Sequence, residues 1–451
     1  MMSKWKEYLI GEIADIVGGS TPSTADPTNF DGDVPWLTPK DLSGLHDRHI
    51  SRGERNLSEK GLASCSAKLL PLGAVMLSSR APIGYLAIAK NPIATNQGFR
   101  SLILKQGFDS EFIYYSLKAN IDELERNASG STFKELSGSA LAHIKIRIPP
   151  LPDQRAIAHI LGTLDDKIEL NRRMNETLEA MARAIFKSWF VDLNPVIDNA
   201  LRAGNPIPSA LAEKAARRRE MLCRAKAEGR DSCFPKHIAD LFPDRFVDSD
   251  LGPIPAGWRV GSVYDEFDIT MGQSPPGDTY NKVGEGLPFY QGRADFGFRF
   301  PGRRVYCKDP TRYANAGDTL ISVRAPVGDI NMASENCAIG RGVAAARHKN
   351  GSRSYTYQFM RSLEDVFARF EAEGTVFGSI GKKDFHSIRC VRLPYDVVIG
   401  FEHLVSPCDN RIEINERESC TLGALRDGLL LRLLSGAFSI KVAEKILRRE
   451  S

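Results

Sequence analysis

The sequence contains no long apolar run. None of its 451 residues belongs to a stretch near the eighteen or so apolar residues that a membrane-spanning helix needs, and no basic segment followed by an apolar one opens the chain. Hydrophobic residues still make up 42% of the chain, which is enough material for real cores. We therefore expect an ordinary globular protein, cytoplasmic and with no membrane partner.

Paired cysteines are also missing. No Cys-x-x-Cys occurs, and the eight cysteines are scattered, at positions 65, 223, 233, 307, 337, 390, 408 and 420. This scatter is typical of reduced and mostly buried thiols, and not of zinc ligands or a disulfide framework. His46 and His49 stand one helical turn apart, but no further ligand cluster supports them, so we expect no metal site.

The motifs of nucleotide-dependent and nucleic-acid enzymes are absent. There is no Asn/Asp-Pro-Pro-aromatic tetrapeptide of amino-methyltransferases, and the nearest run, Asn194-Pro195-Val196, fails at its third position. A phosphate-binding loop, a His-Glu-x-x-His motif and a Gly-x-Gly-x-x-Gly turn are missing too. The acidic pair Asp165-Asp166 falls on a predicted helix and is interpreted as surface charge. The chain is expected to bind and not to catalyse, and its net charge of +4 permits nucleic-acid binding without requiring it.

What the sequence does contain is a duplication. Ser79–Gly84 recurs as Val323–Gly328, an offset of 244 residues. The same offset relates further pairs, namely Gly98 and Gly342, Gly130 and Gly374, Phe133 and Phe377, Ile144 and Ile388, and Pro150 and Pro394. Upstream, Trp5 aligns with Trp258 and Ser20 with Ser274. Solenoid repeats have periods of about 20 to 50 residues, so this is a duplication of whole domains. A pseudo-symmetric molecule of this kind can hold two similar, non-identical objects.

Each copy has the same order of predicted elements. A Trp is followed by a mixed apolar stretch, a Gly/Ser/Pro loop, short strand-like runs, one helix and a last strand that ends at proline. This order predicts an α+β fold with two mixed, strand-rich domains in tandem, at residues 1–150 and 257–396.

After each domain the apolar period becomes helical. Apolar residues then recur at alternating steps of three and four, which predicts a coiled-coil seam between helices at 151–190 and 397–440. The seam residues are Ile157, Leu161, Leu164, Ile168, Leu178, Met181, Ile185 and Trp189 in the first copy, and Phe401, Val405, Cys408, Ile412, Leu422, Leu425, Leu429 and Leu433 in the second.

An asparagine interrupts each helix at the same place. Asn171 and Asn415 are 244 residues apart and lie between the apolar halves of the seam. A buried polar residue at one seam position can fix register at a cost in stability. The alternative, that both asparagines lie on a solvated edge, is equally open.

The segment 191–256 has no counterpart after the second helix. Prolines divide it, and residues 209–227 are predicted to form a basic helix that contains Arg217-Arg218-Arg219. These arginines form either a solvated helix face or a phosphate contact. Residues 441–451 are interpreted as a basic tail.

The repeated polar signals lie in loops. Arg80 and Arg324 each follow a predicted strand and precede Ala-Pro-x-Gly, a tight turn that could project the guanidinium outward. The runs 130–134 and 374–378 place hydroxyl residues beside glycine, which lets a backbone approach phosphate oxygens. Both motifs could instead be simple turns, anchored in the second case by a buried Phe133 or Phe377.

Basic clusters that do not repeat differ between the copies. They are Arg48, His49, Arg52 and Arg55 in the first, and Arg293, Arg299, Arg303 and Arg304 in the second. A shared scaffold with different polar loops suits two different readouts. The DNA-binding candidates are Arg80, Arg324, Arg52, Arg55, Lys134, Arg303, Arg304, Lys382 and Lys383.

Several runs closely resemble the specificity subunit of type I restriction-modification systems. They are Leu-Pro-Asp-Gln-Arg-Ala-Ile at 151–157, Leu-Asp-Asp-Lys-Ile-Glu-Leu-Asn-Arg-Arg-Met-Asn at 164–175, Ala-Ile-Phe-Lys-Ser-Trp-Phe at 184–190, Phe-Pro-Asp-Arg-Phe at 242–246 and Leu-Gly-Pro-Ile-Pro-x-Gly-Trp at 251–258. The resemblance covers nearly the whole chain. The second copy departs from it where Tyr-Asp-Val-Val at 395–398 replaces Leu-Pro-Asp-Gln.

The resemblance implies a non-catalytic subunit that reads double-stranded DNA. Two target recognition domains would each address half of a split, asymmetric site, and the two helices would pack antiparallel as a pseudo-two-fold spacer. Two modification subunits would carry S-adenosylmethionine and methylate adenine, restriction subunits would use ATP and Mg²⁺, and this chain would bind no cofactor. Residues 153–190 span about 57 Å as a helix, enough for half-sites about 34 Å apart.

Two other functions remain open on the residues alone. One is a methyltransferase or nuclease with fused recognition domains, against which the missing catalytic motifs argue. The other is a scaffold that binds protein through both repeats, which predicts no salt-dependent affinity for DNA.

Overall fold

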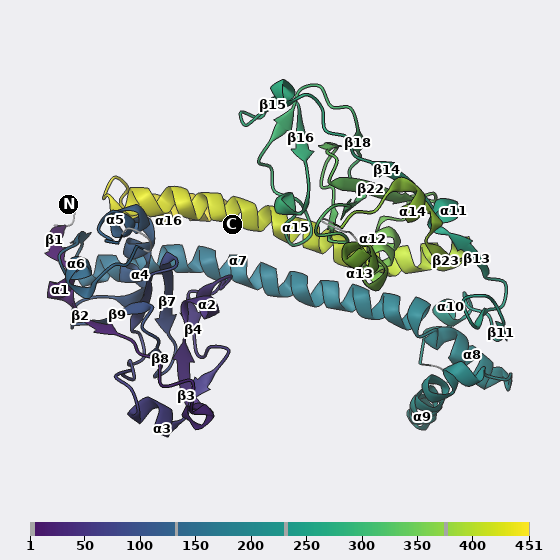
Figure 1. Cartoon of the computed structure of the whole chain (residues 1–451), viewed down its shortest axis with the longest axis horizontal. Helices are drawn as coiled ribbons and strands as arrows, with labels where there is room; N and C mark the ends of the chain where they lie inside the picture. The colour runs from purple at the N-terminus through teal and green to yellow at the C-terminus, as the bar shows by residue number, and fades with distance from the viewer. Residues whose placement is uncertain (1–4, 131–133, 230–232, 374–377, 451) are drawn as a thin grey trace. The chain divides into compact units, whose positions relative to one another are not determined.

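The computed structural model describes residues 5–130, 134–229, 233–373 and 378–450. The chain divides into two compact units, Met1–Arg173 with Glu416–Ser451 (unit 1) and Met174–Asn415 (unit 2). Each unit contains one strand-rich domain and a part of each of two long helices, α7 (Leu151–Phe186) and α15 (Tyr395–Leu434) (Figure 1). The predicted mixed fold with two strand-rich domains and long helices is confirmed.

The central sheet of unit 1 has five strands. In hydrogen-bonded order they are β2 (Ala14–Gly18), β9 (Phe99–Leu104), β6 (Val75–Ser79), β7 (Ile83–Ala89) and β4 (His49–Ile50). The first four are antiparallel to their neighbours. Helix α4 (Ser110–Ala119) and helix α5 (Ile121–Arg126) pack on β7, and α4 begins at the N-cap Asp109, whose carboxylate accepts from the Phe112 amide at 3.0 Å.

Smaller elements complete the first domain. A two-stranded sheet joins β1 (Lys6–Leu9) to β10 (Lys145–Ile148), and a three-stranded sheet has the order β5 (Asn56–Leu57), β3 (Phe30–Leu37), β8 (Ala94–Thr95). The short helices are α1 (Ile10–Ile13), α2 (Pro39–Leu42), α3 (Glu59–Ala63) and α6 (Gly138–Ala142). The sheet with β3 and β8 lies at the end of the domain away from α7 (Figure 1).

Unit 2 repeats this topology. Its antiparallel sheet has the order β14 (Phe267–Met271), β22 (Val343–His348), β19 (Thr319–Ser322), β20 (Ile330–Met332), which matches β2-β9-β6-β7. Strand β13 (Arg259–Ser262) pairs with β23 (Arg389–Arg392), as β1 does with β10. The parallel pair β16·β21 corresponds to β3·β8. The duplication seen in the sequence is therefore a duplication of strand order.

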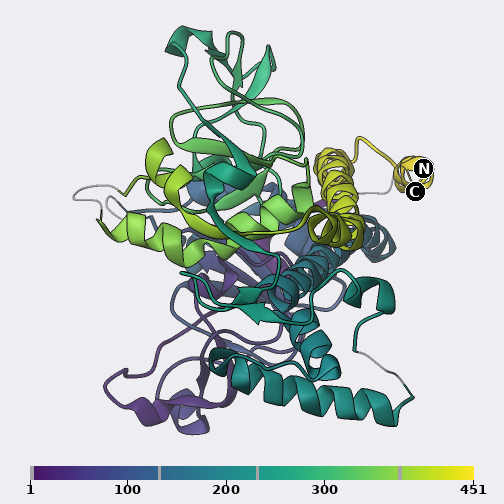
Figure 2. The same ribbon diagram turned by 90° about the vertical axis from the view of Figure 1, so that its right-hand side faces the viewer.

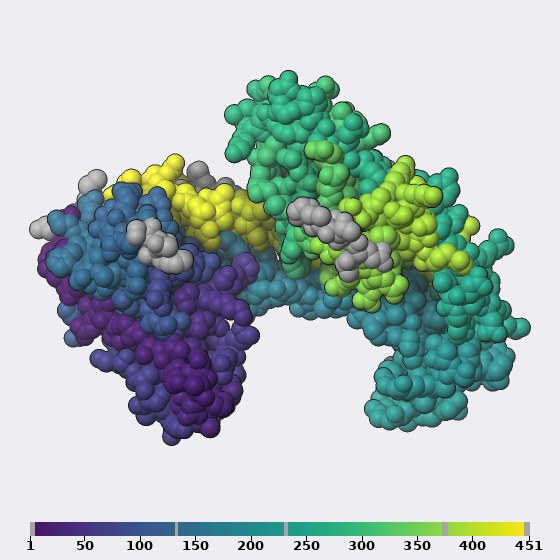
Figure 3. All heavy atoms as spheres, viewed as in Figure 1, coloured from purple at the N-terminus to yellow at the C-terminus, as the bar shows by residue number. Residues whose placement is uncertain are grey.

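A second sheet of unit 2 forms a lobe that stands out from the rest of that unit (Figures 1 and 3). Its strands are β15 (Tyr280–Asn281), β17 (Tyr306–Cys307), β16 (Leu287–Tyr290), β21 (Cys337–Ile339) and β18 (Tyr313–Ala314). The helices of the second domain are α11 (Val263–Glu266), α12 (Arg353–Ser362), α13 (Glu364–Glu373) and α14 (Lys382–Ser387).

The two long helices pair antiparallel within unit 1. Asp165 of α7 contacts Arg426 of α15 at 2.6 Å, whereas Asn171, further along α7, contacts Glu418, further back on α15, at 2.7 Å. Around these contacts, Ile157, Leu161 and Leu164 share one apolar core with Leu429 and Leu433. In unit 2, Phe186 and Trp189 share a core with Phe401 and Val405. The expected antiparallel coiled coil is confirmed.

One seam residue was predicted wrongly. Met181 is 50% exposed, and the fully buried residue beside it is Ala182. The steps of three and four continue from Ile168 through Asn171 and on to Ala182, so the polar residue occupies a core position and the apolar series resumes one residue later than predicted. Leu178 and Ile185 are half-buried.

Both asparagines of the seam are buried. The Asn171 side-chain amide donates to Glu418 at 2.7 Å, and the Asn415 amide donates to the Asn175 carbonyl oxygen at 2.8 Å. Asn171 and Asn415 are both 0% exposed. The buried interpretation is confirmed, and the solvated edge is wrong.

The segment between the copies is largely helical. It contains α8 (Asn194–Ala203), α9 (Ala212–Ala227) and α10 (Lys236–Ala239), and α9 packs beside α8 (Figures 1 and 2). The basic helix is confirmed. Of its three arginines, Arg218 is buried and paired with Asp198, while Arg217 is exposed and paired with Glu213.

The C-terminal boundary differs from the prediction. Helix α15 ends at Leu434 and not at residue 440, and the expected basic tail is a separate helix, α16 (Ile440–Glu450). Gly436, with φ of 75°, lies in the turn between them, because glycine adopts this left-handed conformation without a side-chain clash. The break in the helix explains why the periodic pattern was extended too far.

The eight cysteines are all free. Cys307, Cys337 and Cys390 are buried, whereas Cys223 and Cys420 are exposed and the rest are half-buried, so the expectation that most are buried was wrong. Within the described ranges, no helix is both long and apolar enough to cross a bilayer.

Candidate nucleic-acid interface

Antiparallel pairing gathers the loops of unit 1 at one end of its sheet. Strands β2 and β6 end where β9 and β7 begin, so residues 19–22, 80–82, 96–98 and 134–136 lie together. Backbone hydrogen bonds join them: Ser20 N to Thr95 O at 2.9 Å, Ser79 N to Gly98 O at 2.7 Å and Leu136 N to Ser79 O at 2.9 Å. We call this set the loop end of unit 1.

Unit 2 has a matching loop end, formed by residues 272–276, 323–329, 340–342 and 378–381. Gly272 N donates to Val343 O at 2.9 Å, Val323 N to Gly342 O at 2.9 Å and Ile380 N to Val323 O at 3.1 Å. A Cβ on Gly272 would lie 2.2 Å from Gly340 O, so only glycine allows the loops to approach this closely. The two copies therefore hold the same loops together by the same bonds.

The repeated arginine turn is locked by a buried serine. Ser78 Oγ donates to the Pro82 carbonyl at 2.8 Å and accepts from the Tyr85 amide at 2.8 Å. In unit 2, Ser322 Oγ makes the same two bonds, to Pro326 O at 2.8 Å and from Asp329 N at 2.9 Å. The peptide bonds Ala81-Pro82 and Ala325-Pro326 are both cis. The predicted tight turn is confirmed in both copies.

The structure places the other repeated candidates beside these turns. Arg80 forms a backbone bridge with Glu135, next to Lys134, and Arg324 forms one with Ser379, shortly before Lys382 and Lys383 at the start of α14. Arg80 is half-buried, and the other four cations are exposed. Among the described residues, their side chains make no hydrogen bond or ion pair. Whether each arginine reads bases or phosphates stays a prediction.

Part of the second repeated motif lies outside the described residues. Residues 131–133 and 374–377, including Phe133 and Phe377, belong to this part of the sequence. The proposed phosphate approach and the alternative of a buried Phe anchor both stay predictions. At the described flank of the first motif, Glu135 pairs with Arg100 at 2.9 Å.

The remaining candidates lie in other loops. Arg52 and Arg55 are exposed in the connection from β4 to β5, and Arg55 lies 4.1 Å from the centre of the Phe30 ring. Arg303 pairs with Glu335 at 2.5 Å, and Arg304 pairs with Asp295 at 2.5 Å. All four arginines are exposed. The structure thus does not bring them to the loop ends, and their role stays a prediction.

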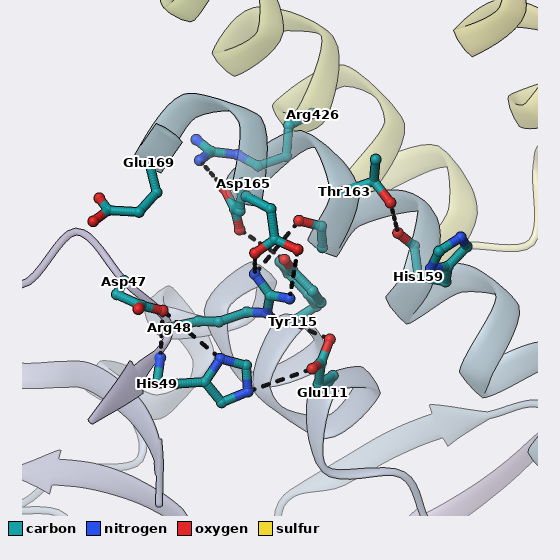
Figure 4. A network of polar contacts seen from close by, with 12 residues as sticks. Asp47, Arg48, His49, Glu111, Tyr115, His159, Thr163, Asp165, Glu169 and Arg426 are labelled. Atoms are coloured by element: carbon teal, nitrogen blue, oxygen red, sulfur yellow. Dashed lines mark hydrogen bonds and ion pairs between the residues drawn. The ribbon is translucent and has the colours of Figure 1, made fainter. Parts of the chain in front are cut away.

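Arg48 of the first basic cluster is an internal anchor (Figure 4). Its buried guanidinium donates to Asp166 of α7 at 2.6 Å and lies 3.4 Å from Glu111 of α4. His49 also approaches Glu111, at 3.4 Å, and together His49 and Arg48 lower the pKa of the Glu111 carboxyl. The network attaches the first domain to α7, so Arg48 is turned away from any ligand.

The same network buries a tyrosine against the long helices of unit 1. Tyr115 of α4 donates to Asp165 at 2.7 Å, and Asp165 also receives Arg426 of α15 at 2.6 Å (Figure 4). Burial, and then the nearby negative charge of Asp165, raise the pKa of Tyr115. The acidic pair interpreted as surface charge is therefore structural at Asp165.

Arg299 has the corresponding role in unit 2. Its guanidinium is 1% exposed, donates to Asp409 of α15 at 2.7 Å, contacts Glu179 of α7 and lies 3.9 Å from the centre of the Tyr357 ring. Asp409 is 244 residues after Asp165. The sequence clusters thus mixed exposed cations with two buried anchors, because charge alone does not reveal burial.

One exposed cation of the unit 2 loop end was missed by sequence reasoning. Arg341 lies between Gly340 and Gly342 and is exposed, whereas the matching residue in the first copy is Gln97. The constant offset that paired Gly98 with Gly342 carried this information, but it was used only to set the alignment. No group of three or more His, Cys, Asp or Glu side chains able to hold a metal ion occurs in the described part of the chain.

Comparison with known proteins agrees with this architecture. Residues 2–180 match the family model of the type I restriction modification DNA specificity domain. The MjaIX specificity subunit of Methanocaldococcus jannaschii is 29% identical, with 97% of this chain and 94% of the relative covered. The HindI specificity subunit of Haemophilus influenzae is 24% identical, with 96% and 100% covered.

The fold is also found in a solved structure. A crystal structure of a type I restriction-modification S subunit from M. genitalium matches with a TM-score of 0.59 at 16% identity, with 96% of each chain covered. The duplicated domains and paired helices are thus the architecture of a modular recognition subunit. The chain belongs to the family of type I restriction-modification specificity subunits.

Proposed function

We propose that this chain is the non-catalytic subunit that reads a bipartite, asymmetric DNA site for a type I restriction-modification complex. The observation that carries this proposal is the pair of matching loop ends on duplicated sheets. Arg80 and Arg324 occupy the same serine-locked turn, while the loops around them differ. Each domain then recognises one half-site, and the two halves differ in sequence because the surrounding side chains differ.

The charge at the loop ends suits DNA. Exposed lysines and arginines without acidic partners neutralise phosphates and release counterions, and an arginine on a rigid turn can also read guanine in the major groove. Lys134, Arg324, Lys382 and Lys383 meet this description among the described residues. An arginine already paired with a carboxylate, such as Arg303, must first give up that partner.

The long helices suit a protein partner. Several large apolar side chains stand exposed along them, and such exposure marks a binding surface more often than chance placement does. These residues are Leu170 and Met181 on α7 and Leu404, Ile414 and Leu431 on α15. Two modification subunits docked here would bring S-adenosylmethionine for adenine methylation, and restriction subunits would bring ATP and Mg²⁺. The chain itself would bind no cofactor.

The test is to sequence the methylome of a host that expresses the chain with its modification subunit. The expected result is N6-methyladenine at one bipartite motif, and no methylation when either protein is expressed alone. Methyl transfer or cleavage by the purified chain would instead indicate a fused enzyme. A chain without salt-dependent affinity for DNA would be a protein scaffold.

A further inference from the structure

One loop at each loop end presents a single side chain from a fixed backbone. In unit 1, Asn96 N donates to Leu37 O at 2.8 Å, and Gly98 N donates to the Asn96 side-chain oxygen at 2.8 Å. A Cβ on Gly98 would lie 2.8 Å from the Pro39 ring. The residues on both sides of Gln97 are therefore held inward, and the exposed Gln97 side chain is the one that the loop presents.

The matching loop of unit 2 is fixed even more tightly. Gly340 N donates to Tyr290 O at 2.8 Å, and Val343 N donates back to Gly340 O at 2.9 Å. A Cβ on Gly342 would lie 2.2 Å from Gln291 O, so no side chain fits there. Arg341 is the only residue of this Gly-Arg-Gly loop with a side chain, and it is exposed.

The neighbouring loop orients the Gln97 amide. Thr21, on the loop after β2, donates its hydroxyl hydrogen to the Gln97 side-chain oxygen. The Gln97 NH₂ group then remains free to donate, and the oxygen keeps a second lone pair. In unit 2 the corresponding loop supports the backbone, since Arg341 N donates to Ser274 Oγ at 3.3 Å. Among the described residues, the Arg341 guanidinium has no acidic partner.

These two residue types recognise different bases. Glutamine makes paired hydrogen bonds to N6 and N7 of adenine, and arginine makes them to O6 and N7 of guanine. Arg80 and Arg324 are identical in the two copies and so do not account for two different half-sites. Gln97 and Arg341 differ at the same structural position, 244 residues apart. A difference in base preference between the domains requires such a position.

We infer that Gln97 and Arg341 are equivalent specificity-determining residues, Gln97 reading an adenine in one half-site and Arg341 a guanine in the other. The inference rests on the proposed function. It adds which side chains read bases and which base each one selects. The rigid loops explain how a single side chain is aimed, because a mobile one would lose discrimination to the entropy of ordering it.

The experiment exchanges the two residue types and reads the methylated motif. Gln97→Arg is expected to change one specified adenine of one half-site to guanine, and Arg341→Gln to change one guanine of the other half-site to adenine. The unaffected half-site stays as in the wild type. The preference for the original base at that position should fall by about 5- to 150-fold, as measured by binding of the complex to paired DNA duplexes.

Matched controls lie away from the loop ends. Gln106 is exposed beyond the last residue of β9, at the opposite end of the strand from Gln97, so Gln106→Arg adds the same charge elsewhere. Arg259→Gln removes an exposed arginine on β13, which precedes β14 and lies away from its final residue. Both control variants should methylate the unchanged motif.

Two outcomes overturn the inference. One is an unchanged motif in the folded, methylating Gln97→Arg and Arg341→Gln complexes. The other is an equal change of affinity for all sequences together with a changed salt dependence, since this identifies phosphate contacts. In both cases the wild-type complex still methylates its motif and the proposed function stands. If the wild-type complex methylates nothing, the proposed function itself fails.

Discussion

The buried guanidinium of Arg299 lies 2.7 Å from the Asp409 carboxylate, on the long helix of its own repeat. Glu179 of α7 and the Tyr357 ring complete its surroundings, so one side chain from the strand-rich domain joins both helices of unit 2. Arg48 makes the corresponding contact with Asp166 in unit 1. Each domain is thus attached to its helices by an arginine that is not free for DNA.

Arg299→Met should destabilise unit 2 strongly. The substitution leaves Asp409 and Glu179 buried, at 2% and 7% exposure, without their cation. Breaking one side of a buried ion pair costs about 3 to 5 kcal/mol. Urea denaturation followed by circular dichroism measures the loss. Arg303→Met, which removes an exposed partner of Glu335, should cost about 1 kcal/mol or less. Equal losses in the two variants would contradict the anchoring role of Arg299.

Stability should depend on Glu111 in a pH-dependent way. The hydrogen bond from His49, and then the charge of Arg48, lower the pKa of Glu111 below its ordinary value of 4.5. A carboxyl with a lowered folded-state pKa stabilises the fold fully above its unfolded value, and this contribution is lost as pH falls through the folded value. The wild type should therefore exceed Glu111→Gln in free energy of unfolding near neutral pH, by about 1 kcal/mol.

The difference between the two proteins should shrink as the pH is lowered below 4.5 and then vanish. Urea denaturation at a series of pH values measures it. Glu125→Gln is the matched control, because Glu125 is exposed on α5 and has no printed partner among the described residues. A wild-type advantage that persists unchanged into acid would show that Glu111 acts through packing and not through its charge.

The paired helices should set the gap in the recognised motif. Seven residues added to both α7 and α15 preserve the seam and lengthen each helix by about 10 Å, or three base pairs at about 3.4 Å each. The unspecified gap in the methylated motif should widen while both half-sites stay the same. Five residues added to each helix break the heptad pattern and should abolish methylation. An unchanged gap in an active heptad variant means that these helices are not the ruler.

The sequence predicts this molecule well where information is periodic or repeated. The offset of 244 residues identified both domains, and the apolar steps identified both helices, because burial on one helix face leaves a regular signature. Met181 was misplaced because a polar core position, Asn171, interrupts the apolar series. The end of α15 was misplaced because the pattern does not show the turn at Gly436.

The sites were harder to predict, because burial and pairing come from tertiary contacts. Arg299 and Arg303 look alike in the sequence, yet one is 1% exposed and the other 58%. Residue 341 was hidden for the opposite reason, since a lone arginine between glycines has no charge cluster around it. Only the folded backbone shows that the loop has nothing else to present.

The last prediction concerns the shared arginines. Arg80 follows β6 and Arg324 follows β19, each in a turn locked by the preceding serine. Arg80→Ala should therefore weaken or relax one half-site, and Arg324→Ala only the other. If the arginine contacts a base, the loss is about 1 to 3 kcal/mol and is confined to one position of the motif.

A phosphate contact gives a different result. Affinity then falls for all sequences alike, and the slope of log affinity against log salt becomes smaller by about 0.9 for each lost contact. Binding of each variant complex to a panel of half-site duplexes at several salt concentrations separates the two roles, with Arg259→Ala as the control on β13. Because the turn is the same in both domains, both arginines should have the same role. If both substitutions leave affinity and specificity unchanged, the repeated turn is structural, and recognition must come from Gln97, Arg341 and the exposed cations beside them.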